Sequence, residues 1–77
     1  MKIEVLGAGC PKCRKSMEMI SQAIKKTGID AEIVHVTELN DIIDRGVMMT
    51  PAIFINGKKV LEGRIPTEGQ IKQWLAK

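Results

Sequence analysis

The chain has 77 residues, of which 44% are hydrophobic, 27% are charged and only 3% are aromatic, and its formal net charge is +3. This length predicts one small domain over residues 1–77, with a core that buries roughly 60% of the surface of the unfolded chain. No apolar run approaches the ~20 residues of a membrane-spanning helix, and the first residues lack a signal-peptide pattern. Aromatic side chains are too few to alternate with basic ones on a nucleic-acid surface. We expect a cytoplasmic monomer without membrane or nucleic-acid partners.

The first third of the chain predicts a strand followed by a helix. The segment Lys2–Leu6 is mostly apolar and predicts the strand. Pro11 suits the first position of a helix, where its missing N–H costs no hydrogen bond, and Gly28 suits the end of that helix. Apolar residues recur every three or four positions along one face of this helix: Cys13, Met17, Ile20 and Ile24.

The middle of the chain predicts a second strand and a short helix. Ala31–Val36 follows a strand and a helix, so we expect it to pair parallel with the first strand. His35 belongs to this strand and is expected to be a surface or partly packed edge residue. Thr37 is expected to cap the short helix, and Gly46 to end it. Three residues of this helix are expected to face inward: Leu39, Ile42 and Ile43.

The last third predicts a hairpin and a final helix. The continuous apolar run Ala52–Ile55 predicts a central strand covered on both faces. The pair Asn56-Gly57 predicts a tight turn into a return strand over Lys58–Glu62. Thr67 and Gln70 have the spacing of a capping box at the start of a helix. Three residues of that helix are expected in the core: Ile71, Trp74 and Leu75.

The resulting order, β-α-β-α-β-β-α, predicts an α/β fold with a four-stranded mixed sheet and three helices. The only two cysteines, Cys10 and Cys13, enclose Pro11 and Lys12 where the first strand leads into the first helix. Helical N–H groups without intrahelical partners favour a thiolate there. Cys13 lies on the apolar stripe and should be buried, whereas Cys10 should lie at the exposed helix entrance, with a pKa lowered by the helix and Lys12. Such a pair is redox-active or binds a metal.

The segment Thr50–Gly57 adds a second motif, because Thr50-Pro51-Ala52-Ile53-Phe54-Ile55-Asn56-Gly57 resembles the segment of thioredoxins and glutaredoxins in which the proline is cis. Over essentially its whole length the chain is similar to the small archaeal and bacterial thioredoxin-like proteins known as redox-active disulfide protein 2. The resemblance implies the thioredoxin-like fold. In that fold the third strand runs antiparallel to the first, which places Pro51 beside the end of the strand from which Cys10 emerges.

The resemblance also implies a function, thiol–disulfide exchange. Cys10 would attack a substrate disulfide, and Cys13 would then attack Cys10, so that the two form a redox-active disulfide. We expect Pro11, Lys12 and Pro51 to support catalysis by the two cysteines. We expect the Thr50 backbone and Met49 to bind the substrate. The implied partners are disulfide-containing proteins or small thiols and an upstream reductase, either thioredoxin-reductase-like or glutathione. No cofactor and no metal are expected.

Several positions depart from the related families. Lys12 replaces the tyrosine of glutaredoxins, or is simply a solvated surface lysine, and Glu62 stands near where glutaredoxins hold glutathione. Glu4, six residues before Cys10, matches a buried aspartate that serves proton transfer in thioredoxins, or is a strand charge that reaches solvent. Met48 and Met49 line a substrate groove or fill the core.

Two other functions stay open. The Gly7–Cys13 segment also resembles the loop of heavy-metal-associated domains, which carry Cu(I) between two thiolates. Those domains run β-α-β-β-α-β and end on a strand, and a zinc site would need two more ligands. The third possibility is a thioredoxin-like module that docks partners without catalysis.

Overall fold

A computed structural model describes residues 1–7 and 11–76 of the chain. The described elements follow the predicted order. The strands are β1 (Lys2–Leu6), β2 (Glu32–Val36), β3 (Ala52–Ile55) and β4 (Lys58–Glu62). The helices are α1 (Pro11–Thr27), α2 (Leu39–Asp44) and α3 (Glu68–Leu75). The predicted fold class is therefore confirmed, and among the strands only the start of β2 differs, by one residue.

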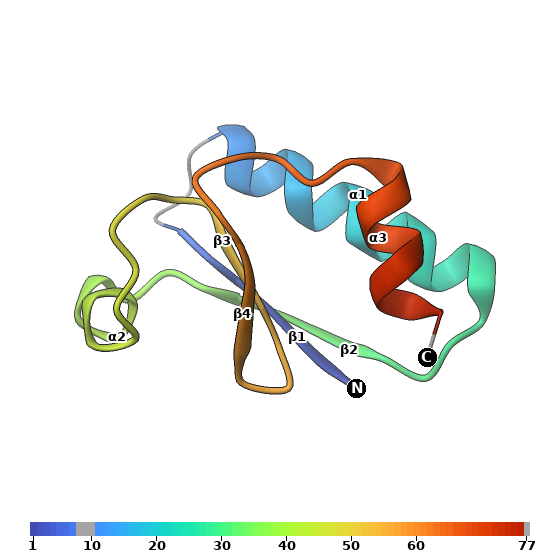
Figure 1. Cartoon of the computed structure of the whole chain (residues 1–77), viewed down its shortest axis with the longest axis horizontal. Coiled ribbons are helices and arrows are strands. Elements are labelled where there is room, and N and C mark those ends of the chain that lie inside the picture. Colours follow the sequence, from blue (N-terminus) through green and yellow to red (C-terminus); the bar gives the residue numbers. More distant parts are fainter. Residues whose placement is uncertain (8–10, 77) are drawn as a thin grey trace.

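The four strands form one mixed sheet in the order β2-β1-β3-β4. β1 pairs parallel with β2 and antiparallel with β3, and β3 pairs antiparallel with β4. Leu6 at the end of β1 lies opposite Ala52 at the start of β3. The segment that leads into β3 therefore approaches the end of β1, as the resemblance implied (Figure 1).

The two faces of the sheet carry separate cores, because successive side chains of a strand point to opposite faces. α1 and α3 pack together over one face, where Ile3, Val5 and Ile53 are buried with Ile20 and Ile71. The other face carries a smaller cluster of Leu6, Ile42, Val47, Ala52 and Phe54. Figure 1 shows α2 standing apart from the other two helices, near the ends of the strands.

The helix ends mostly follow the expected local rules. The Thr67 hydroxyl accepts from the Gln70 N–H at 3.1 Å, and the Gln70 side chain accepts from the Thr67 N–H at 2.9 Å, which confirms the capping box. Gly28 and Gly46 follow α1 and α2 with positive φ, as predicted. The cap of α2 was predicted wrongly, because Glu38 rather than Thr37 occupies that position and makes no side-chain cap bond.

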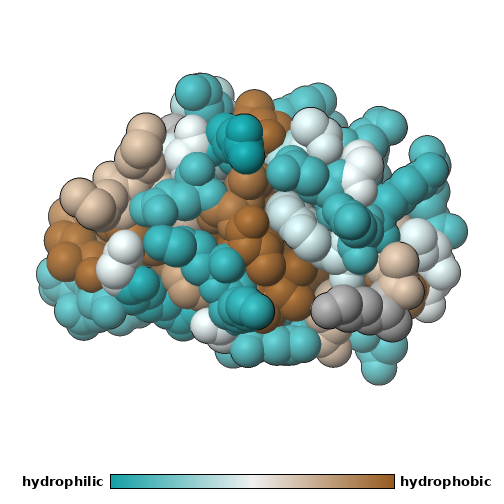
Figure 2. All heavy atoms as spheres, viewed as in Figure 1, coloured by the Kyte–Doolittle hydropathy of each residue, from teal (hydrophilic) through white to brown (hydrophobic). Residues whose placement is uncertain are grey.

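The inward face of α2 was also predicted wrongly in part. Ile42 is buried, but Leu39 and Ile43 are 62% and 59% exposed. A helix of six residues has fewer than two turns, so few of its side chains can face the sheet at once. In α2 the buried residue is Ile42. Figure 2 shows hydrophobic side chains at the surface at the left of the view, the end of the molecule where α2 lies. Trp74 packs against the larger core but stays partly exposed.

None of the helices in residues 1–7 and 11–76 combines the length and the apolar character that a bilayer crossing requires.

Candidate active site

Cys13 lies in the first turn of α1 and is completely buried. Pro11 is the first residue of the helix, as predicted, and both Pro11 and Lys12 are exposed. The apolar stripe is confirmed, because Cys13 and Ile20 are buried and Met17 and Ile24 partly so. Cys10, and with it the predicted disulfide to Cys13, lies outside the described residues.

Gly7, just beyond the end of β1, lies directly against the Cys13 side chain. A Cβ atom added at Gly7 would overlap the Cys13 Sγ and would lie 3.3 Å from the Cys13 Cβ and 3.6 Å from the Thr50 Cβ. The backbone φ of Gly7 is not in the left-handed region, so this glycine is required by space rather than by conformation. Gly7 thus lies close both to Cys13 and to Thr50, in the segment before β3. In the sequence, Gly7 was noted only as the first residue of the Gly7–Cys13 segment.

The bond between Thr50 and Pro51 is cis, as the resemblance implied. Pro51 is fully buried and its carbonyl accepts from the Gly63 N–H at 2.8 Å, which ties the start of β3 to the end of β4. Thr50 is exposed beside Gly7. The structure therefore brings Thr50 close to Gly7 and Cys13, which lie far from it in the sequence.

Met48 and Met49 precede this bond and are 91% and 62% exposed, so the core-filling interpretation of these residues is wrong. Their backbone N–H groups both donate to one oxygen of Glu62, at 2.6 Å and 3.1 Å. The other oxygen of Glu62 accepts from Lys59 at 2.9 Å. These three bonds lower the pKa of the Glu62 carboxyl to about 2, with the Lys59 bond as the largest cause. Glu62 therefore holds the Met48-Met49 backbone in place, a role the sequence did not reveal.

Glu4 is buried, which overturns its interpretation as a strand charge in solvent. Its carboxylate contacts the Arg45 guanidinium at 2.7 Å, and Arg45 lies over the Phe54 ring at 5.6 Å from the centroid. The hydrogen bond from Arg45 outweighs burial and lowers the pKa of Glu4. A general base at neutral pH needs a pKa nearer 7, so this environment opposes proton transfer by Glu4.

His35 lies on the edge strand β2 and is partly buried, as expected. Its Nε2 is 3.0 Å from the Gly7 carbonyl oxygen. This contact joins residues that are far apart in the chain, so no local pattern indicated it.

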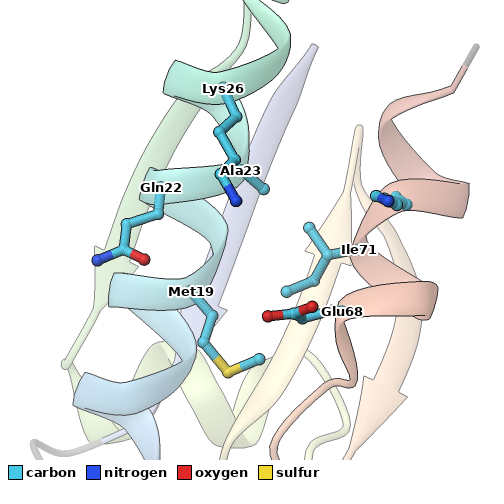
Figure 3. Close-up of a pocket in the computed structure, with 7 residues that line it drawn as sticks. Met19, Gln22, Ala23, Lys26, Glu68 and Ile71 are labelled. Carbon is cyan, nitrogen blue, oxygen red and sulfur yellow. The ribbon is translucent and has the colours of Figure 1, made fainter.

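A surface pocket lies elsewhere, between α1 and α3 (Figure 3). It is lined by Met19, Gln22, Ala23, Lys26, Glu68, Ile71 and Lys72. None of the predicted site residues lines it, so its position does not bear on the predicted chemistry. Among the described residues, no group of three or more histidine, cysteine, aspartate and glutamate side chains is placed to hold a metal ion.

Comparisons with known proteins identify a family for nearly the whole chain. The family model of the thioredoxin domain matches residues 1–76. The chain is 42% identical over 73 residues to a thioredoxin of Methanocaldococcus jannaschii, covering 95% of this chain and 84% of that protein. It is 32% identical over 76 residues to a thioredoxin of Methanothermobacter thermautotrophicus, covering 99% of each.

A shorter match, 39% identical over 61 residues, links 74% of the chain to 72% of a probable thioredoxin of Methanothermobacter marburgensis. The first two matches cover 95% and 99% of this chain. The chain therefore belongs to the thioredoxin family and is a small thioredoxin-like redox protein.

Proposed function

We propose that this protein is a dithiol–disulfide oxidoreductase that uses Cys10 and Cys13 to reduce disulfides. The observation that carries the proposal is the position of Cys13, buried in the first turn of α1 beside Thr50 and the cis bond to Pro51. A buried thiol three residues after a second cysteine suits the resolving role, because a substrate in solvent does not reach it directly.

The proposed reaction has two exchange steps. The Cys10 thiolate attacks one sulfur of a substrate disulfide, forms a mixed disulfide and releases the other substrate sulfur as a thiolate. The Cys13 thiolate then attacks the Cys10 sulfur, forms the Cys10–Cys13 disulfide and releases the second substrate thiolate. The substrate gains two electrons, and an upstream reductase returns two electrons to the protein.

The other proposed site residues support the cysteines or bind the substrate. Pro11 begins the helix, and the exposed Lys12 adds positive charge beside the cysteines. The Thr50 backbone and Met49 would contact an extended substrate segment, supported by the exposure of both residues next to Gly7 and Gly63. Pro51 would fill the space beside the sulfurs with hydrocarbon.

Single cysteine variants test the proposal. We expect Cys10→Ser to abolish disulfide reduction and Cys13→Ser to accumulate a mixed disulfide with the substrate, because the second step is then blocked. Mass spectrometry of both variants with a disulfide substrate distinguishes them. If only the Cys10→Ser variant retains substrate, the two roles are reversed.

The electron donor and the two alternative functions are tested on the wild-type protein. Turnover is measured with a flavin-dependent thioredoxin reductase and, separately, with glutathione and its reductase. Absence of turnover with both donors would favour a docking module. Tight Cu(I) binding in competition with a chelator would favour a metal carrier, although the observed β-α-β-α-β-β-α order differs from that of heavy-metal-associated domains.

A further inference from the structure

His35 faces the same side of the sheet as the active-site helix. It is paired with Val5 in the parallel ladder between β1 and β2, and Val5 belongs to the core under α1 and α3. Its Nε2 lies 3.0 Å from the Gly7 carbonyl oxygen. A carbonyl oxygen can only accept a hydrogen bond, so this geometry assigns the proton to Nε2.

Gly7 is bound to β2 through both of its backbone polar groups. The last pair of the β1–β2 ladder is Leu6 with Val36, and the Gly7 N–H donates to the Val36 carbonyl at 2.9 Å. The His35 side chain donates to the Gly7 carbonyl, one residue beyond that last pair. The imidazole therefore adds one more bond between β2 and the chain after β1. This bond is made to Gly7, the residue that lies against Cys13.

The position of Gly7 limits the position of the Cys13 sulfur. Gly7 leaves no room for a Cβ beside Sγ, and Thr50 lies close to Gly7 as well. Since Cys13 is fully buried, its sulfur cannot move away from Gly7 without disturbing the packing around it. Gly7 also precedes Cys10 by only three residues in the sequence.

We propose that His35 is a positioning residue for the Cys10–Cys13 redox couple, acting through its hydrogen bond to Gly7. The inference rests on the proposed function. Two thiols form an intramolecular disulfide more readily when they are held in a narrow range of positions, because the effective concentration of one at the other is higher. Loss of the bond lets Gly7 move, widens the range available to the Cys13 sulfur and makes the disulfide easier to reduce.

The test measures the equilibrium between reduced protein with oxidised dithiothreitol and disulfide protein with reduced dithiothreitol. In this exchange the protein loses two electrons and two protons to the reagent. His35→Phe keeps a ring but removes the donor, and we expect it to lower the equilibrium constant for disulfide formation about tenfold, which equals a potential about 30 mV less negative. His35→Gln, whose amide N–H₂ can reach a similar position, should stay within about twofold of wild type.

Two further variants separate positioning from general stability. Ile33→Ala, two residues away on the same face of β2, removes packing without touching Gly7 and should lower the urea midpoint but leave the equilibrium constant unchanged. His35→Leu repeats the donor loss if the phenylalanine variant does not fold.

The outcomes separate this inference from the proposed function. Any of three results for the equilibrium constant of disulfide formation overturns the positioning role. The first is a change of less than threefold in His35→Phe or His35→Leu. The second is an equal change in Ile33→Ala, and the third is a His35→Gln value that differs from wild type by more than about twofold. A wild-type protein that forms no intramolecular disulfide overturns the proposed function and this inference with it.

Discussion

Gly7 shows how a single hydrogen atom in place of a side chain shapes the site. The residue lies close to both Cys13 and Thr50, which are far apart in the sequence, and it allows the end of β1 to approach the first turn of α1. A larger residue would have to displace the buried sulfur or the backbone that follows β1.

We predict that Gly7→Ala destabilises the protein by about 1–3 kcal/mol, the usual cost of inserting a methyl group into a packed site. Urea unfolding measures this change. Gly69→Ala is the matched control, because a Cβ there meets nothing closer than the Thr67 Oγ1 at 3.9 Å. In a helix that control should be neutral or stabilising by up to about 1 kcal/mol. Equal effects in the two variants would contradict the steric argument.

At the scale of elements, the segment between α2 and β3 is ordered by a side chain from β4. The Glu62 carboxylate accepts both N–H groups of Met48 and Met49 while their side chains stay exposed. Met49 also lies over Gly63, with its Cβ 3.2 Å from where a Gly63 Cβ would be. The proposed substrate-binding segment is thus held by its backbone, which leaves its side chains available to a partner.

We predict that Glu62→Ala increases amide hydrogen exchange at Met48 and Met49 and raises KM for a protein disulfide. The two N–H groups lose their acceptor, so the segment opens more often. Lys59→Ala is the control, because it removes only the partner of the other carboxylate oxygen. Unchanged exchange in the Glu62 variant would show that the segment is held by other contacts.

The same carboxylate predicts a pH dependence. The pKa of Glu62 is lowered from 4.5 to about 2 in the folded protein. A lowered pKa means that the stabilising contribution is complete above about 4.5 and is lost as the pH falls through about 2. A carboxyl titration by NMR should therefore show Glu62 ionised at about pH 3, between these two values. A midpoint near the ordinary glutamate value would contradict the three hydrogen bonds.

At the scale of the whole molecule, the Glu4–Arg45 pair joins the sheet to α2. Glu4 is a buried residue of β1, whereas Arg45 follows α2 and covers Phe54 of β3. Ile42 is the only buried residue of α2, and this ion pair adds a second contact between the end of the helix and the sheet. The same pair keeps a carboxylate charged beneath the surface.

We predict that Arg45→Met destabilises the protein by about 1–3 kcal/mol at neutral pH, because it leaves the Glu4 charge buried without its partner. The value lies below the roughly 3–5 kcal/mol of a fully buried pair, since the Arg45 side chain is 35% exposed and solvent screens it. Adding Glu4→Gln should recover most of the loss. Urea unfolding of the single and double variants measures the coupling, and additive losses would contradict it.

Acid unfolding gives a second measurement of this pair. The folded-state pKa of Glu4 is lowered, so the contribution of the pair is complete above the ordinary value of 4.5 and is lost as the pH falls through the folded value. Glu4→Gln should therefore lose less stability than wild type when the pH is lowered below 4.5. Parallel loss in both proteins would show that other carboxyl groups dominate the acid transition.

The sequence by itself determined the features that depend on neighbouring residues. Apolar periodicity, Pro11, the Asn56-Gly57 turn and the Thr67 capping box predicted the elements and their order, because each depends on contacts within a few positions. The resemblance to thioredoxins, which rests on Thr50-Pro51 and the cysteine spacing, further implied the thioredoxin-like fold and the cis bond before Pro51. Burial of Cys13 followed from its place on the helix stripe.

Only the tertiary structure decided which distant residues complete the site. The contacts of Glu62 with Met48, of His35 with Gly7 and of Glu4 with Arg45 join positions 14, 28 and 41 residues apart. No helical or strand periodicity relates residues at such separations, and a charged or polar residue in a strand pattern has the same appearance whether it meets solvent or a partner. Side-chain contacts of this kind arise only when the sheet brings its strands together, which is why the residues that hold the site were found in the fold and not in the motif.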